Sequence, residues 1–191
     1  PGCRLGPRAI RAASVQLAEL PSFSFGFEPF SRVDVIDSGD FLLNPHNPET
    51  IVLDIYERAK SIISSGASLI SMGGDHFISY PLLKAHAEVH GPISLLQFDA
   101  HCDTWEDDGY SLDHGTMFAR AVKEGLIDVN SSTQIGLRTF NDDDYGFEIL
   151  SAPWVHRNGI QKSLDIIKKR AQNNPLYISF DVDGLDPAFA P

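Results

Sequence analysis

The chain has 191 residues, of which 42% are hydrophobic and 21% are charged, and its formal net charge at pH 7 is -11. This composition is typical of a globular domain with a sizeable core. The negative charge argues against nucleic acid or an anionic membrane surface as a partner, and it favours a small cationic ligand.

Signals for a particular compartment are few. No apolar stretch reaches the about 18 residues that a membrane span requires, and the start lacks the layout of a signal peptide. The two cysteines, Cys3 and Cys102, have no zinc or redox spacing, so we expect the cytoplasm, or an organelle after import. We also expect a single domain over residues 1–191, incomplete at both ends, because the chain begins without methionine and stops in a turn-like segment.

Apolar runs alternate with segments of helical spacing along the chain, which predicts βα units around a mainly parallel sheet, an α/β fold. In chain order we expect a helix at Pro7–Leu20, a strand at Val33–Ile36, a helix at Pro48–Ser65, a strand at Ser68–Met72, a helix at Ser79–His90, a strand at Ile93–Phe98, a helix at Thr116–Glu124, a strand at Thr133–Leu137, a helix at Ile160–Gln172 and a strand at Leu176–Phe180. Ligands of such folds bind where the carboxyl ends of the strands meet the loops.

Acidic residues and one histidine follow two of the predicted strands, Ile93–Phe98 and Leu176–Phe180, at that edge. In an extended strand alternate side chains share a face, so we expect Asp99, His101 and Asp103 to point the same way, and Asp181 to align with Asp183. Four carboxylates at one end of a sheet would repel one another unless cations bind. Two divalent ions would bring the cluster close to neutrality, so the pattern predicts a dinuclear metal site.

A third corner supplies a second imidazole, because His76 follows a glycine pair that lets the backbone turn tightly. Oxygen ligands with a minority of nitrogen favour manganese, although zinc and cobalt use the same ligand types. An Asp-x-Asp motif alone, or a Gly-Gly-Asp-His motif alone, is more often a loop or a helix cap than a metal site. Capping asks for one polar oxygen per helix, however, so it does not explain three such corners at successive strand ends.

These corners resemble the signatures of the ureohydrolase (arginase and agmatinase) family. The family signatures match Gly73–His76, Asp99–Asp103 and Ser179–Pro187. Three further stretches also match and look closest to agmatinases: Gly6–Arg11, Asp113–Phe118 and Lys123–Ile127. The resemblance implies an arginase-like three-layer αβα architecture with a doubly wound sheet. It also implies hydrolysis of a guanidino group to urea and an amine, most closely agmatine to putrescine, and a trimer or hexamer.

The resemblance also assigns roles to the site residues. It implies two Mn²⁺ ions, one held by His76, Asp99, Asp103 and Asp181 and the other by His101, Asp99, Asp181 and Asp183, with Asp99 and Asp181 bridging. Asp183 would first accept the proton that reaches the leaving amine, and His114 matches the family's proton shuttle. Without the motif, His114 would be interpreted as a structural histidine before a helix, capped by Asp113.

The acidic residues Glu106, Asp107 and Asp108 directly follow the metal motif. They are candidates for facing a cationic substrate, although a solvated loop is the more frequent meaning of such a run. They would repel the α-carboxylate of arginine, so we expect a substrate without one. Two alternatives stay open: another guanidino substrate such as guanidinobutyrate, and a metal-binding homologue without catalysis.

Family members also continue beyond the last of these motifs, and that later part supplies a carboxylate that grips the guanidinium. We therefore expect a polypeptide limited to residues 1–191 to be inactive.

Overall fold

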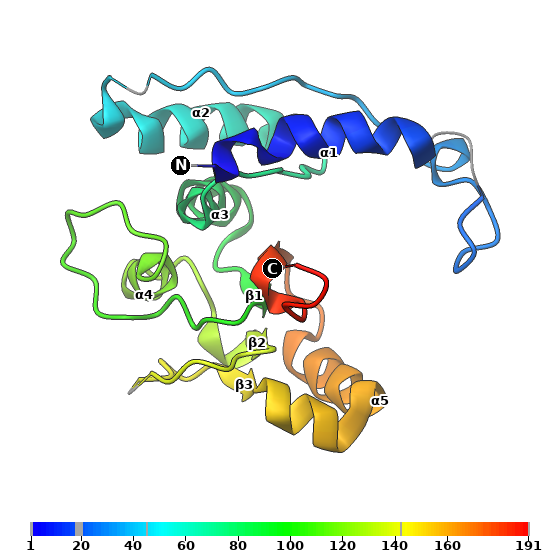
Figure 1. Cartoon of the computed structure of the whole chain (residues 1–191). Helices are drawn as coiled ribbons and strands as arrows, with labels where there is room; N and C mark the ends of the chain where they lie inside the picture. The colour runs from blue at the N-terminus through cyan, green and yellow to red at the C-terminus, as the bar shows by residue number, and fades with distance from the viewer. Residues whose placement is uncertain (1, 18–20, 45, 142, 191) are drawn as a thin grey trace.

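The computed structural model describes residues 2–17, 21–44, 46–141 and 143–190. Its α-helices are α1 (Gly6–Ser14), α2 (Ile51–Ser64), α3 (Ser79–His90), α4 (Met117–Lys123) and α5 (Ala152–Ala171), and its strands are β1 (Ser94–Phe98), β2 (Thr133–Ile135), β3 (Glu148–Leu150) and β4 (Leu176–Phe180). Figure 1 shows the sheet in the middle of the molecule, with α3 and α4 on one side and α5 on the other. None of the helices within the described ranges is both long and apolar enough to cross a membrane.

The four strands form one parallel sheet in the order β3-β2-β1-β4. The chain winds from β1 outward through β2 to β3, then returns across the sheet through α5 to add β4 on the other side of β1. Strand order thus reverses between β1 and β4, and ligands bind at such a switch point in doubly wound sheets.

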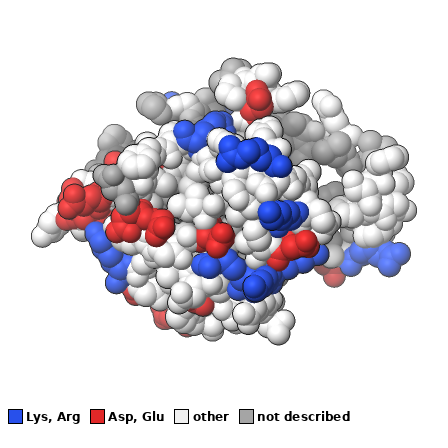
Figure 2. All heavy atoms as spheres, turned by 90° about the horizontal axis from the view of Figure 1, so that it is seen from below, with Lys and Arg blue, Asp and Glu red and all other residues white. Residues whose placement is uncertain are grey.

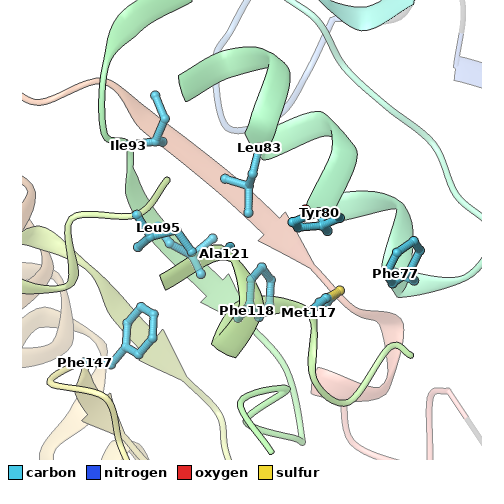
Figure 3. Packing of buried hydrophobic residues seen from close by; sticks show 10 residues of the cluster. Phe77, Tyr80, Leu83, Ile93, Leu95, Met117, Phe118, Ala121 and Phe147 are labelled. Carbon is cyan, nitrogen blue, oxygen red and sulfur yellow. The ribbon is translucent and has the colours of Figure 1, made fainter. Parts of the chain in front are cut away.

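The core on one face of the sheet lies between β1 and the helices α3 and α4. Alternation along β1 sends Leu95 to this face, where it is fully buried. Figure 3 shows Leu83 of α3 and Phe118 of α4 packed around it, and both are also fully buried. Helix α2 covers the outer side of α3 through a separate apolar cluster that includes Ile55 and Leu82.

The opposite face of the sheet is covered by α5. Leu96, the neighbour of Leu95, points to this side and packs with Leu150 and Ile167. Both faces of the central strand are therefore buried, as expected for a parallel sheet between two helical layers. The three-layer αβα prediction is confirmed.

Two predicted strands, Val33–Ile36 and Ser68–Met72, are wrong. Both segments are irregular and have no ladder partner among the described residues. The apolar residues predicted a strand at both places. A strand also needs a hydrogen-bonded neighbour, however, and the residue pattern of one segment does not show whether a neighbour exists. Several of their apolar side chains are exposed, including Ile36 and Ile70.

The other predicted elements are present, α3 and β4 with the predicted bounds and the rest with shifted ones. The helix predicted at Pro7–Leu20 is α1 followed by a 3₁₀ turn at Val15–Leu17, and residues 18–20 lie outside the described ones. Helix α5 begins eight residues before the predicted start at Ile160. Gly159, whose φ of 83° is not helical, interrupts it, and the predicted helix corresponds to the part after this interruption. Strand β3 was not predicted, since three residues give too short a pattern.

One edge of the sheet is less well covered. Strand β4 pairs with β1 on one side and has no partner on the other among the described residues. Of its five residues only Ser179 is buried, whereas Ile178 and Phe180 are more than half exposed.

Candidate metal centre

The first ligands of the site are placed by the register of two neighbouring strands. Phe98, the last residue of β1, is paired with Phe180, the last residue of β4. Asp99 directly follows β1 and Asp181 directly follows β4, and the Asp181 amide donates to the Phe98 carbonyl at 2.9 Å. Both carboxylates therefore stand side by side at the switch point of the sheet.

The remaining acidic candidates, Asp103 and Asp183, lie beyond the strand ends, so strand alternation is not what positions them. Strands β1 and β4 end at Phe98 and Phe180. Beyond them, the Asp99 carboxylate accepts from the His101 amide at 2.7 Å, and the Asp181 carboxylate accepts from the Asp183 amide at 3.1 Å. An aspartate that bonds the backbone two residues on favours a turn, and this preference ends each strand.

His76 brings the third corner to the same place. It begins the 3₁₀ turn η5 (His76–Ile78), which Asp75 caps by accepting from the Phe77 amide at 3.0 Å. The His76 Nδ1 atom lies 2.8 Å from an oxygen of Asp103, 3.1 Å from one of Asp181 and 3.2 Å from one of Asp99.

His101 forms a second group on the other side of Asp99. Its Nδ1 lies 3.0 Å from an Asp183 oxygen and 3.5 Å from an Asp99 oxygen. The second Asp183 oxygen accepts from the Ala100 amide at 3.2 Å, which ties the β4 loop to the β1 loop.

Two sets of possible metal ligands result, and each has its ligand atoms within 4.8 Å of one another: His76, Asp99 and Asp181, and Asp99, His101 and Asp183. The structure thus brings all six predicted ligands together, with Asp99 in both sets and Asp103 against His76.

The carboxylates of this cluster shift the pKa values of its members. Burial opposes protonation of His76, but the carboxylates of Asp103, Asp181 and Asp99 around it outweigh burial and raise its pKa to about 11. Burial raises the pKa of Asp103 to about 6 and also raises the pKa of Asp183. The cluster therefore requires positive charge among its carboxylates.

Metal ions fit this requirement better than a proton does. His76 Nδ1 is buried and has no hydrogen bond of good geometry, although three carboxylate oxygens surround it. Its other nitrogen, Nε2, lies 2.7 Å from the Ser179 hydroxyl. A hydrogen bond donated there leaves the Nδ1 lone pair facing the carboxylates, which is the arrangement of a metal-binding histidine. The donor set of carboxylate oxygens and imidazoles suits divalent ions.

Two glycines allow the backbones around Asp99 to pack closely. A Cβ atom at Gly184 would lie 3.1 Å from the Asp99 nitrogen, and one at Gly136 would lie 3.1 Å from the Asp99 carbonyl oxygen. Gly136 also has a φ of 95°, which favours glycine. The loops after β2 and β4 can therefore pack against the backbone of Asp99 from both sides.

His114 is exposed and contacts Asp75, the residue before the candidate ligand His76. Its Nδ1 is 3.2 Å from an oxygen of Asp75, whereas the neighbouring Asp113 bonds the Gly115 amide at 2.6 Å. The interpretation of His114 as a histidine capped by Asp113 therefore does not describe its contacts. Asp75, part of the first motif, received no role from the sequence and is the residue that holds His114.

The three acidic candidates after the metal motif have different surroundings. Asp107 is nearly buried and paired with Arg120 at 2.5 Å. Asp108 accepts from the Ser111 hydroxyl and from the amides of Tyr110 and Ser111, which lower its pKa to about 2. Glu106 is exposed. The structure thus gives Asp107 and Asp108 bonds within the protein and leaves Glu106 facing solvent.

Sequence reasoning missed several residues that hold the ligands in place. Ser179 orients His76, and it lies inside the third motif, where its position two residues before Asp181 could have identified it. Arg138 donates to the backbone carbonyls of Asp183 and Leu185, the latter at 3.0 Å, and nothing in its sequence context signals this role.

Comparison with known proteins gives consistent matches along the whole chain. The sequence model of the Arginase family matches residues 1–191. A curated agmatinase of Chromobacterium violaceum is 56% identical over 192 residues, covering 100% of this chain and 60% of that protein. A curated agmatinase of Neisseria meningitidis serogroup A is 46% identical over 191 residues, covering 100% and 62%. The chain therefore spans about three fifths of the length of these relatives.

Solved structures agree with the sequence matches. A crystal structure described as a hypothetical agmatinase from Burkholderia thailandensis superposes with a TM-score of 0.96 at 53% identity, covering 99% of this chain and 61% of that one. Proclavaminate amidino hydrolase from Streptomyces clavuligerus superposes with a TM-score of 0.88 at 31% identity, covering 100% and 66%.

Proposed function

Because the chain belongs to the arginase family, we propose that it forms the metal centre of a ureohydrolase that converts agmatine and water to putrescine and urea. The observation that carries the proposal is the pair of ligand sets sharing Asp99 at the switch point of the sheet. The 56% identity to a curated agmatinase supports agmatine over other guanidino compounds.

We infer two Mn²⁺ ions as the cofactor, held by the six residues His76, Asp99, His101, Asp103, Asp181 and Asp183. When bound, such ions make hydroxide available near neutral pH and stabilise negative charge on a reacting centre. The prevalence of carboxylate oxygens over imidazoles supports manganese over softer ions.

The protein's own part in the reaction is to hold the ligands and to move a proton. One C–N bond of the guanidinium breaks, a C–O bond forms with water, and the departing amine needs a proton. Asp183 suits the transfer because burial raises its pKa, which makes it a stronger base than an exposed aspartate. The Ala100 amide bonds one of its oxygens at 3.2 Å and so fixes its orientation.

The overall charge supports a cationic substrate. The net charge of -11 attracts a cation and opposes an anion at long range. On the face in Figure 2 basic and acidic side chains are interspersed, while acidic ones gather toward one edge. The charge therefore also disfavours phosphate esters, although phosphatases use similar ligands.

The test of the proposed function is a substrate panel with the manganese-loaded full-length protein, because residues 1–191 alone are expected to be inactive. Urea should be released fastest from agmatine, and putrescine should appear in equal amount. Faster release from guanidinobutyrate would establish the alternative substrate. A protein that binds two metal ions and releases no urea from any guanidino compound would instead be a non-catalytic homologue.

We infer that His114 relays the proton between the site and solvent, since it is exposed and held by Asp75. Replacement by asparagine should lower kcat for agmatine roughly 10- to 100-fold and change metal content little, because general acid-base groups contribute factors of this size. Exogenous imidazole should restore part of the rate. His156→Asn, on α5, is the matched control, and equal losses in both variants would contradict the relay.

We also infer a homo-oligomer, a trimer or hexamer, in which the segment 22–36 contacts another copy. Its aromatic side chains are exposed, with Phe23, Phe25 and Phe30 all more than half accessible. Sedimentation velocity should give at least three chains per particle, and Phe25→Ser should shift the distribution toward smaller species. Ile160→Ser, at a residue of α5 that is also more than half exposed, should leave assembly unchanged. A monomeric wild-type protein would contradict the assignment.

A further inference from the structure

Two glutamines lie side by side beneath the metal centre. Gln97 of β1 and Gln134 of β2 are register partners in adjacent parallel strands, so their side chains point to the same face of the sheet. Neither has any exposed surface. Burying an amide costs free energy unless its polar atoms are hydrogen-bonded, so a pair of buried amides requires a structural reason.

The two amides form a directed chain of hydrogen bonds that ends on the shared ligand. Gln134 Nε2 donates to the Cys102 carbonyl and to Gln97 Oε1, both at 2.6 Å. Gln97 Nε2 donates to Asp99 Oδ2 at 2.8 Å and to the His101 carbonyl at 3.3 Å. All four N–H groups of the pair therefore have partners, and Gln134 Oε1 is the one polar side-chain atom of the pair without one.

The direction of this chain is fixed by its ends. The carbonyls of His101 and Cys102 and the Asp99 carboxylate can only accept hydrogen bonds, so neither glutamine can turn its amide round without losing both of its partners there. The chain thus holds one carboxylate and two backbone carbonyls of the same loop at once.

The atom that receives the last bond faces one of the two ligand sets. Asp99 Oδ2 lies 3.2 Å from His76 Nδ1, while Asp99 Oδ1 accepts from the His101 amide and faces the second set. The Gln97 bond therefore fixes the rotation of the carboxylate that both sets share. A neutral amide fixes this rotation and leaves the negative charge of Asp99 available to a cation. A lysine in its place would neutralise that charge.

We propose that Gln134 and Gln97 form a positioning relay that orients Asp99 and thereby sets the affinity of the site for divalent metal, with Gln97 acting directly and Gln134 acting through Gln97. The proposal rests on the proposed metal centre, but it does not require agmatine as the substrate.

The test is a metal titration of Gln97→Met, Gln134→Met and the double variant. Methionine keeps the length and volume of the side chain and removes its hydrogen bonds. Outer partners of metal ligands commonly contribute 10- to 100-fold to affinity, so Gln97→Met should weaken Mn²⁺ binding by about that factor, measured by competition with a fluorescent chelator. Gln134→Met should weaken it less, and the double variant should match Gln97→Met.

A second readout separates positioning from general loosening of the core. The visible spectrum of the Co²⁺-substituted protein should change in Gln97→Met, because the geometry of a shared ligand changes. Gln97→Asn covers the case in which the methionine variants fail to fold, and it should give the same weakening, since its shorter amide cannot reach Asp99.

Gln161→Met, on the exposed side of α5, is the matched control and should behave as the wild type. Unchanged metal affinity and an unchanged Co²⁺ spectrum in a folded Gln97 variant would overturn the relay. So would losses that multiply in the double variant, because that outcome means that the two amides act independently. Failure of the proposed function would look different: wild-type metal binding without urea release.

Discussion

Replacing Asp181 by asparagine is expected to remove most of the bound metal and to lower urea release from agmatine at least about a hundredfold. Outer partners of metal ligands already contribute 10- to 100-fold, and Asp181 is a candidate ligand itself, with an oxygen 3.1 Å from His76 Nδ1. Asparagine retains an oxygen that can accept from the Asp183 amide, so the turn after β4 is preserved. The variant therefore tests the charge of the carboxylate.

The measurement is metal content by elemental analysis after loading and desalting, together with initial rates in excess Mn²⁺. Asp165→Asn on α5 is the matched control, because Asp165 is exposed and bonds only Gln161 among the described residues. Wild-type metal content and rate in the Asp181 variant would show that this carboxylate is not a ligand. Restored activity at high Mn²⁺ would place the defect in affinity.

The parts of the fold that local patterns govern could be predicted. Helix α3 was predicted with its observed bounds, Ser79–His90, because its helical spacing ends at a glycine, Gly91, whose φ is 81°. The candidate ligands could be grouped because carboxylates and imidazoles recur after three apolar runs, and the structure brings these side chains together.

The geometry of the same site could not be predicted, because it depends on which segments are neighbours. Asp99 and Asp181 meet only because β4 pairs with β1 in a register that aligns Phe98 with Phe180. The acidic motifs form turns because the first aspartate of each bonds a backbone amide, which alternation along a strand does not anticipate.

The contacts that hold the candidate ligands in place could not be predicted from the sequence either. Gln97 and Gln134 are 37 residues apart and meet through strand pairing, and Arg138 reaches the loop after β4 across a similar separation. A glutamine in an apolar run looks like an interruption of the pattern. Its value follows only from a partner that lies elsewhere in the chain.

Discrimination against arginine is expected to be the second large effect. Arginine is agmatine with an added α-carboxylate, and the loops bonded around the site offer that group little positive charge. Arg120 is paired with Asp107, and Arg138 donates to the carbonyls of Asp183 and Leu185. A carboxylate that enters such surroundings loses its hydration without gaining a cationic partner.

An unpaired buried polar group costs roughly 1–3 kcal/mol, and more when it is charged, and a cost of about 3 kcal/mol corresponds to a factor of about a hundred in kcat/KM. We therefore expect kcat/KM for agmatine to exceed that for arginine at least about a hundredfold, measured as urea release from both compounds. Comparable values would mean that a cation outside these contacts recognises the carboxylate.

The exposed Glu106 gives this expectation a sharper form. Replacing Glu106 by arginine introduces a cation beside the metal motif, so it should raise kcat/KM for arginine and lower it for agmatine, which narrows the ratio between them. Glu57→Arg makes the same change of charge on the exposed side of α2 and should leave the ratio unchanged. If both variants narrow the ratio equally, the discrimination comes from the overall negative charge and Glu106 does not face the substrate.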